Sequence, residues 1–105
     1  MVNLSSVSGF EWDEGNAYKS EQKHKISQGD AEEVFFNQPV YFFDDIRHSR
    51  NEARWILLGR TNQGLGLSIV FTLRRKNSLI RVISARPMSR KERIIYEKAN
   101  QENNS

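Results

Sequence analysis

Residues 67–75, LSIVFTLRR, alternate clearly between two kinds of side chain. One side holds Leu67, Ile69, Phe71 and Leu73, and the other holds Ser68, Val70, Thr72 and Arg74. A period of two residues is that of a β-strand with one buried face. The turn KNS at 76–78 separates this run from a second strand-like run, LIRVISAR at 79–86. Consecutive strands joined by so short a turn pair antiparallel, so the sequence predicts a β-hairpin at the centre of the fold.

Two earlier runs, VYFFDD at 40–45 and ARWILLGR at 53–60, extend the hairpin to a meander of four strands. GFEW at 9–12 predicts a further short strand. Asp13 is placed to cap a helix over 14–25, and Ser27 with Asp30 gives a partial capping box for a second helix that ends at NQP, 37–39.

At the other end of the chain, Pro87 ends the last strand, and Ser89 with Glu92 forms an S-x-x-E capping box for a C-terminal helix. Ile95 and Ala99 are expected to form the inner stripe of that helix. The order of elements predicts an α+β protein with an antiparallel sheet of four strands, or slightly more, whose N- and C-terminal helices cover one face. We expect a compact single domain over residues 1–105, with a folded core at about 9–99 and flexible segments at 1–8 and 100–105.

The net charge of +3 is the sum of two unlike halves. Residues 1–52 hold five Lys or Arg against ten Asp or Glu, a balance of −5, and residues 53–105 hold eleven against three, a balance of +8. A basic half indicates a phosphate-bearing or acidic partner, although a solvated surface sorted along the chain is the alternative. The chain has no cysteine, no long apolar run and no signal peptide, so we expect a cytoplasmic protein without membrane contact.

Arginines are concentrated on the predicted strands. Arg54 and Arg60 share one face of their strand, and Arg74 lies on the polar side of the next. Ideal alternation points Arg81 and Arg86 in opposite directions unless a bulge or the strand end intervenes, so the sequence leaves open which of them joins Arg54 and Arg74. The guanidinium fork suits phosphate oxygens and the charge that develops at phosphorus during RNA cleavage. Alternatively, these arginines only keep an exposed sheet soluble.

His24 is the candidate for proton transfer, because the imidazole is the side chain that changes charge nearest neutral pH. Ser20 lies one helical turn earlier, with Lys19 and Lys23 as neighbours. A helix-terminal histidine that packs or caps the last carbonyls is the alternative. Tyr96 is suited to stack on a base or bind phosphate, and equally suited to the edge of the core.

Several motifs occur in a fixed order over residues 10–98: FEWDEGN, KHKIS, AEEVFF, DDIRHS, GRTNQG, VFTLR and RVISARPMSRKERIIYE. In these motifs the chain resembles the BrnT family of type II toxins. The resemblance implies a RelE-like fold and endoribonuclease activity on messenger RNA that arrests translation. It also implies a BrnA-type antitoxin that forms a hetero-oligomer with the toxin and carries the DNA-binding part, so that operator DNA is reached only through the antitoxin.

Carried over to this chain, the characteristic polar positions of the family are Lys23, His24, His48, Arg54, Thr72, Arg74, Arg81, Ser84, Arg86, Glu92, Arg93 and Tyr96. When these family positions are combined with the chemistry of the side chains, the expected catalytic residues are His24, Arg54, Arg81 and Arg86. The expected RNA-binding residues are Lys19, Lys23, Arg60, Thr72, Arg74 and Tyr96. No cofactor and no metal are expected.

Two positions depart from the family pattern: Ser20 stands where the family has Asn, and Lys25 where it has a Gly suited to the left-handed turn that ends a helix. A second hypothesis is a non-catalytic module that binds RNA or the antitoxin and acts in operon autoregulation. The sequence contains no helix-turn-helix or ribbon-helix-helix pattern, which disfavours a DNA-binding regulator.

Overall fold

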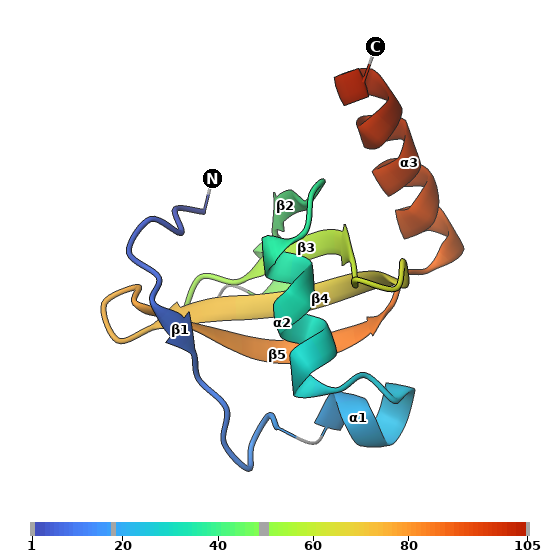
Figure 1. The fold of residues 1–105 in the computed structure, drawn as a ribbon. Helices are drawn as coiled ribbons and strands as arrows, with labels where there is room; N and C mark the ends of the chain where they lie inside the picture. Colours follow the sequence, from blue (N-terminus) through green and yellow to red (C-terminus); the bar gives the residue numbers. More distant parts are fainter. Residues whose placement is uncertain (1, 18, 49–50, 105) are drawn as a thin grey trace.

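The computed structural model describes residues 2–17, 19–48 and 51–104. Its centre is a five-stranded mixed sheet in the order β1-β5-β4-β3-β2 (Figure 1). The strands are β1 (Gly9–Phe10), β2 (Tyr41–Asp44), β3 (Trp55–Arg60), β4 (Gly66–Arg74) and β5 (Leu79–Pro87). The helices are α1 (Lys19–His24), α2 (Gln28–Phe36), the 3-10 turn η1 (Ile46–His48) and α3 (Arg90–Asn104). The predicted α+β class and antiparallel meander β2–β5 are confirmed.

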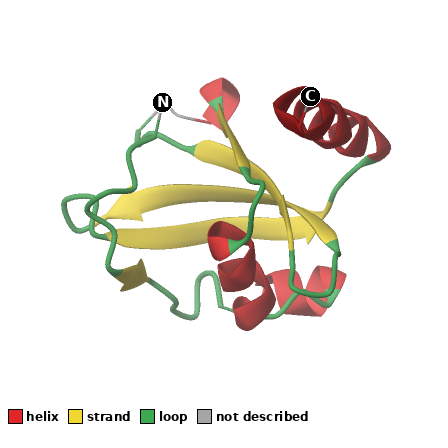
Figure 2. Ribbon diagram, turned by 45° about the horizontal axis from the view of Figure 1, so that its top comes forward, coloured by secondary structure: helices red, strands yellow, loops and turns green. Residues whose placement is uncertain are grey.

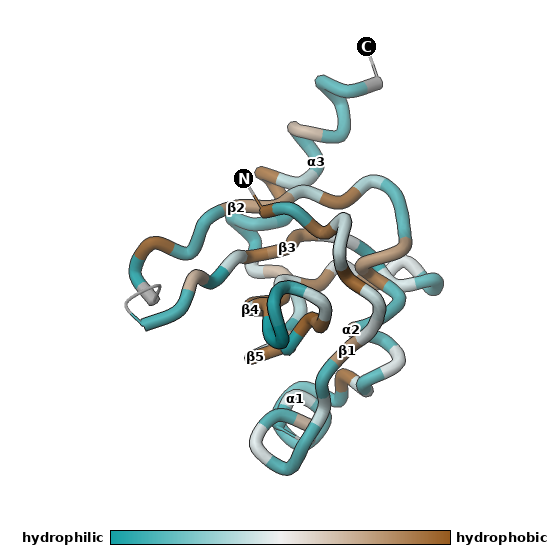
Figure 3. The backbone as a smooth tube through the Cα atoms, turned by 90° about the vertical axis from the view of Figure 1, so that its left-hand side faces the viewer, coloured by the Kyte–Doolittle hydropathy of each residue, from teal (hydrophilic) through white to brown (hydrophobic). Residues whose placement is uncertain are grey.

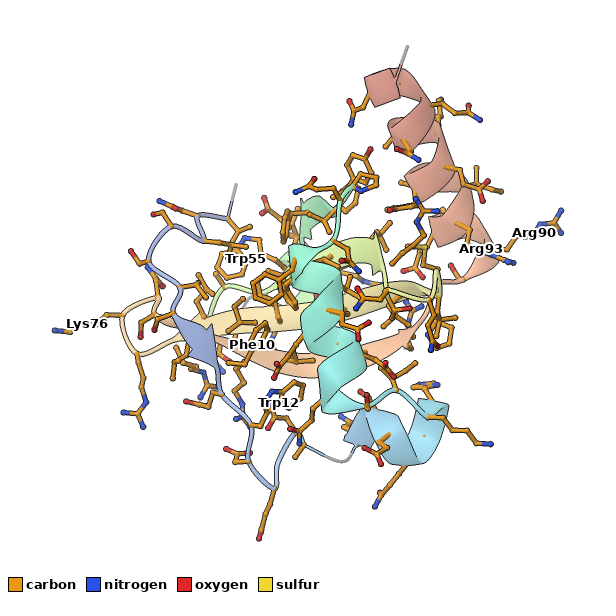
Figure 4. All side chains as sticks on the ribbon, viewed as in Figure 1. Phe10, Trp12, Trp55, Lys76, Arg90 and Arg93 are labelled. Atoms are coloured by element: carbon orange, nitrogen blue, oxygen red, sulfur yellow. The ribbon has the colours of Figure 1, made fainter. Side chains whose placement is uncertain are left out.

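The prediction of an antiparallel sheet needs one correction, because β1 adds a fifth strand that runs parallel to β5. Phe10 explains the position of this strand. Its ring meets the ring of Phe35 on α2 edge to face, with centroids 5.3 Å apart. Because this ring packs between the sheet and α2, the N-terminal segment lies along the edge of β5. Phe10, Trp12 and Trp55 all lie around α2 and the adjoining strands in Figure 4.

The first helix is shorter than the predicted range of 14–25, since in the described residues it begins only at Lys19. Asp13 caps a turn and not a helix. Its carboxylate accepts the Gly15 N–H at 2.8 Å, and its own N–H donates to the side-chain oxygen of Asn16 at 2.8 Å. Such reciprocal side-chain bonds favour a turn over a helix. Tyr18, inside the predicted range, lies outside the described residues.

The capping box of α2 is complete although it carries Asp in place of Glu. The Ser27 hydroxyl accepts the Asp30 N–H at 3.0 Å, and the Asp30 carboxylate accepts the Ser27 N–H at 3.2 Å. The helix then buries Val34 against β3, where Gly59 is needed for close approach. A Cβ at Gly59 would lie 2.6 Å from Val34 Cγ1.

The main core lies between the sheet and α2, with Ile26 from the segment before that helix. Its members include Leu67, Ile69 and Phe71, all fully buried, so the predicted apolar side of β4 is confirmed. The prediction that all helices cover one face is wrong, because α3 lies on the opposite side from α1 and α2 (Figure 2). Met88, between β5 and α3, packs with Leu58 on that second face, so the chain has changed faces before α3 begins.

The predicted inner stripe of α3, Ile95 and Ala99, is only partly correct, because Ala99 is half-buried but Ile95 is exposed. Tyr96 anchors the helix: it is 4% exposed, and its hydroxyl donates to the Pro39 carbonyl at 2.7 Å, whereas Ile95 is 40% exposed. Beyond this anchor the helix continues to Asn104 and is mostly hydrophilic (Figure 3), and the Asn103 amide donates to the Tyr41 hydroxyl of β2 at 2.9 Å. Among the described residues, no helix combines the length and the apolar character needed to cross a membrane.

Candidate functional site

A β-bulge in β5 determines where the arginines point. The pairing Val70–Ser84 is followed by Phe71–Val82, so Ile83 is skipped in the register. Because of this extra residue, Arg81 and Arg86 lie on the same face of the sheet, opposite Thr72 and Ser68 of β4 respectively. Arg81 and Arg86 therefore both lie with Arg74 on the side of the sheet away from the main core, although ideal alternation points them in opposite directions.

At one end of this face Arg81 is held by two carboxylates. Its guanidinium donates to Glu11 at 3.1 Å and to Asp13 at 2.9 and 3.0 Å, and its side chain is only 14% exposed. The hydrogen bond from Arg81, followed by that from the Gly15 N–H, holds the pKa of Asp13 below its ordinary value. In this arrangement Arg81 ties the N-terminal segment to β5.

The neighbouring positions of β4 are similarly engaged. Arg74 donates to Glu52 at 3.1 Å and lies 3.9 Å from a Glu11 oxygen. Thr72 is 1% exposed, and its hydroxyl donates to the Ala53 carbonyl at 2.7 Å. These two predicted RNA-binding residues therefore contribute to the construction of the sheet end. Arg54 directly precedes β3 and follows Ala53, whose carbonyl accepts the Thr72 hydroxyl. It therefore lies at the same end of the sheet.

At the other end Arg86 forms a two-bond ion pair with Glu92. Its two terminal nitrogens donate to the two Glu92 oxygens at 2.7 and 2.9 Å. The same carboxylate accepts the Ser89 N–H at 2.8 Å and the Ser68 hydroxyl at 3.1 Å. Burial raises the pKa of Glu92, but the hydrogen bonds from Arg86 and Ser89 outweigh it and lower the pKa to about 2.

The α1 helix is attached to the edge of β5 by side chains. The Ser20 hydroxyl accepts the Ala85 N–H at 2.9 Å, and the Asn16 amide donates to the Val82 carbonyl at 2.9 Å. These side-chain bonds satisfy backbone groups on the edge of β5 beyond the point where the short β1 strand ends. Lys25 then ends α1 in the left-handed conformation, with φ of 59°, and its N–H donates to the Glu21 carbonyl at 2.9 Å.

Between α1 and β5 lies a cleft of about 230 Å³. It is lined by Lys19, Ser20, Lys23, His24, Ser84 and Arg86. Four of the predicted site residues, from two separate parts of the chain, thus meet in one place. A histidine, two lysines and an arginine around a small cleft suit an anionic ligand whose reaction requires proton transfer.

Arg60 and Tyr96 are not part of this cleft. The Arg60 guanidinium lies 5.5 Å from the centroid of the Tyr96 ring, in a cation–π arrangement. Arg60 also lines a polar depression of about 340 Å³ beside Asn37 and Asn62. Because Tyr96 is buried and its hydroxyl is used, the arrangement favours the core-edge interpretation of this residue.

Three residues of the site were not among the expected catalytic or RNA-binding residues. Ser84 reaches the cleft because the bulge at Ile83 shifts its face, which alternation does not reveal. The sequence marks Ser20 only as a neighbour of His24 and as a departure from the family pattern. Glu92 was interpreted as a helix cap, and the S-x-x-E motif gives no sign that its second oxygen pairs with Arg86.

Residues 12–92 match the family model of the ribonuclease toxin BrnT of type II toxin–antitoxin systems. Among curated proteins, none matches the chain. The family match covers most of the chain, including α1, the whole meander and the Arg86–Glu92 pair. The chain therefore belongs to the BrnT family of ribonuclease toxins of type II toxin–antitoxin systems.

Proposed function

We propose that this protein is an endoribonuclease that cleaves messenger RNA in the cleft between α1 and β5 and thereby arrests translation. The observation that carries the proposal is the meeting of His24 and Arg86, from α1 and β5, in one cleft with Lys19 and Lys23. The family assignment supplies the class of reaction.

In the proposed reaction the RNA's own 2′-hydroxyl is the nucleophile, and no metal ion is required. His24 takes the hydroxyl proton as the 2′-oxygen attacks phosphorus. The bond to the 5′-oxygen breaks, that oxygen takes a proton from water, and a 2′,3′-cyclic phosphate remains. Arg86, Lys19 and Lys23 bind the phosphate oxygens and stabilise the negative charge that builds up on them.

The other arginines of the face act around this centre in the proposal. Arg54, Arg60 and Arg74 extend the path of the RNA backbone across the sheet, and Arg81 keeps β5 and the N-terminal segment in place. Thr72 ties the end of β4 to the Ala53 carbonyl, and the Tyr96 ring supports Arg60.

The biological setting follows from the family. We infer a RelE-like single domain that acts in the cytoplasm and forms a hetero-oligomer with a BrnA-type antitoxin. In that complex operator DNA is bound by the antitoxin alone.

Two observations favour a second function, a non-catalytic module that binds RNA or the antitoxin and acts in operon autoregulation. Both terminal nitrogens of Arg86 are occupied by Glu92, so fewer donors are left for a phosphate. Ser20, which replaces the amide of the family, is itself used to bind the Ala85 N–H. In this function the cleft would hold RNA without cutting it.

Induction of the toxin without its antitoxin separates the two functions. An active nuclease stops growth and shortens messages, and His24→Ala and Arg86→Ala both relieve these effects. Lys76→Ala is the matched control, because Lys76 points into solvent from the β4–β5 hairpin (Figure 4) and should leave toxicity unchanged. Intact messages in growth-arrested cells would contradict the nuclease proposal and support the binding module.

A further inference from the structure

A small apolar groove lies between α3 and the second face of the sheet. Its volume is about 150 Å³, and it is lined by Phe43, Ile56, Leu58, Glu92 and Ile95. Phe43 and Ile56 are directly paired across β2 and β3. Phe43 is 42% exposed, Ile95 40% and the adjacent Ile94 59%. The groove therefore leaves aliphatic and aromatic surface in water that the chain itself does not cover.

The helix that borders the groove is held to the rest of the chain mainly by polar contacts and buries little apolar surface. Among the side chains of α3 that the structure describes, Tyr96 alone is buried. A helix of 15 residues with a single buried side chain gains little stability from apolar packing, the source of most helical stability in proteins. A partner that covered Ile94 and Ile95 would supply that packing.

The charges around the groove indicate the chemistry of such a partner. Along the chain, Ile56 and Leu58 of β3 lie between Arg54, which directly precedes the strand, and Arg60, which ends it. An apolar centre with a basic border is complementary to a segment whose apolar side chains are flanked by carboxylates.

We propose that this groove is the docking site of the toxin's antitoxin, which inserts an apolar segment flanked by acidic residues. The inference rests on the proposed function for its regulatory meaning, and the family assignment requires that an antitoxin exists. Glu92 lines the groove and also holds Arg86 of the cleft. An antitoxin seated here therefore lies beside the arginine proposed to bind the scissile phosphate, and blocks the approach of RNA to it.

The test uses the full-length toxin and the purified protein product of the reading frame adjacent to its gene. Phe43→Asp and Ile95→Asp place a carboxylate in the groove, and each should weaken binding by at least about 30-fold in a calorimetric titration. Phe36→Asp is the matched control, since Phe36 is an apolar side chain 76% exposed on α2. The control should bind within about threefold of the wild type. Wild-type affinity in both groove variants, or no binding by the wild type, would overturn the proposal.

Two further measurements make the outcome unambiguous. Thermal unfolding of each variant establishes that it is folded at the temperature of the titration. Cleavage of RNA by the free variants should equal that of the wild type and should no longer be inhibited by the antitoxin. If the wild type cleaves no RNA, the proposed function fails, while the titration still decides the docking site. If sedimentation shows a dimer of the toxin alone that Phe43→Asp dissociates, the occupant is a second copy and the antitoxin proposal is wrong.

Discussion

Arg86 on β5 and Glu92 on α3 are joined by two parallel hydrogen bonds of 2.7 and 2.9 Å, and the same carboxylate caps the helix through the Ser89 N–H. One acidic side chain thus has two functions. It starts α3, and it holds the guanidinium of Arg86, a residue that lines the cleft together with His24. Two-bond pairs of this kind restrict geometry more than single contacts do.

The first prediction concerns Glu92 as a positioning residue. Glu92→Gln retains the size of the side chain but removes the charge that orients Arg86. We expect kcat for RNA cleavage to fall about tenfold with KM little changed, because a small displacement of an oriented group weakens the transition state. Glu97→Gln, on the exposed surface of the same helix, is the control. A change confined to thermal stability would show that Glu92 is only a cap.

The second prediction concerns acid stability. The pKa of Glu92 is lowered in the folded protein from its ordinary 4.5 to about 2, so the unfolded chain binds more protons between these values. The stabilising contribution is therefore complete above pH 4.5 and is lost as the pH falls toward 2. Because the pair is partly exposed, we expect a contribution of about 1–2 kcal/mol to the free energy of unfolding.

Urea titrations of the wild type and Glu92→Gln measure this contribution. They run from about pH 2.5 to about pH 7, roughly two units on either side of the ordinary carboxyl pKa. The difference between the two proteins should be largest near neutral pH and should shrink as the solution is acidified. A difference independent of pH would contradict the assignment.

The third prediction concerns Lys25, which has a φ of 59° at the end of α1. Glycine adopts this conformation without the steric cost that a Cβ brings. Lys25→Gly should therefore raise the free energy of unfolding by about 0.5–1 kcal/mol. Lys25→Ala, which loses the same charge and retains the Cβ, should give no such gain. Equal stability of the two variants would show that the left-handed position carries no strain.

The fourth prediction compares two glycines. A Cβ at Gly59 meets Val34 at 2.6 Å, whereas the nearest atom to a Cβ at Gly29 lies 3.8 Å away in the first turn of α2. Gly59→Ala should lower the free energy of unfolding by about 1–3 kcal/mol, because α2 must move off the sheet. Gly29→Ala should raise it by up to about 1 kcal/mol through helix propensity. Chemical denaturation of both variants provides the test, and a neutral Gly59→Ala would refute the close contact.

The parts of the fold that depend on local pattern could be predicted from the sequence. The alternation of β4, the short turn before β5 and the capping boxes at Ser27 and Ser89 are all local signals, and each element was found where expected. The failures have non-local causes. The start of α1 was set by the turn bonds of Asp13, and the side on which α3 lies was set by the burial of Tyr96 against Pro39.

The candidate site shows the same limit. His24 and Arg86 were both expected, but their meeting depends on the skipped residue Ile83, which leaves no mark in the alternation. The charge asymmetry of the sequence was also only partly informative. Glu11 and Asp13 of the acidic half pair with Arg81, and Glu52 pairs with Arg74, so much of the apparent basic surface is compensated within the chain.

The central claim is that His24 and Arg86 act together in RNA cleavage within the α1–β5 cleft. It is tested most directly by single-turnover cleavage of a labelled RNA by the purified toxin in the presence of EDTA. His24→Ala and Arg86→Ala should each lower the rate by at least about a hundredfold, and the double variant should lose little more, because the residues serve one step. Cleavage at the wild-type rate by either single variant would contradict the account.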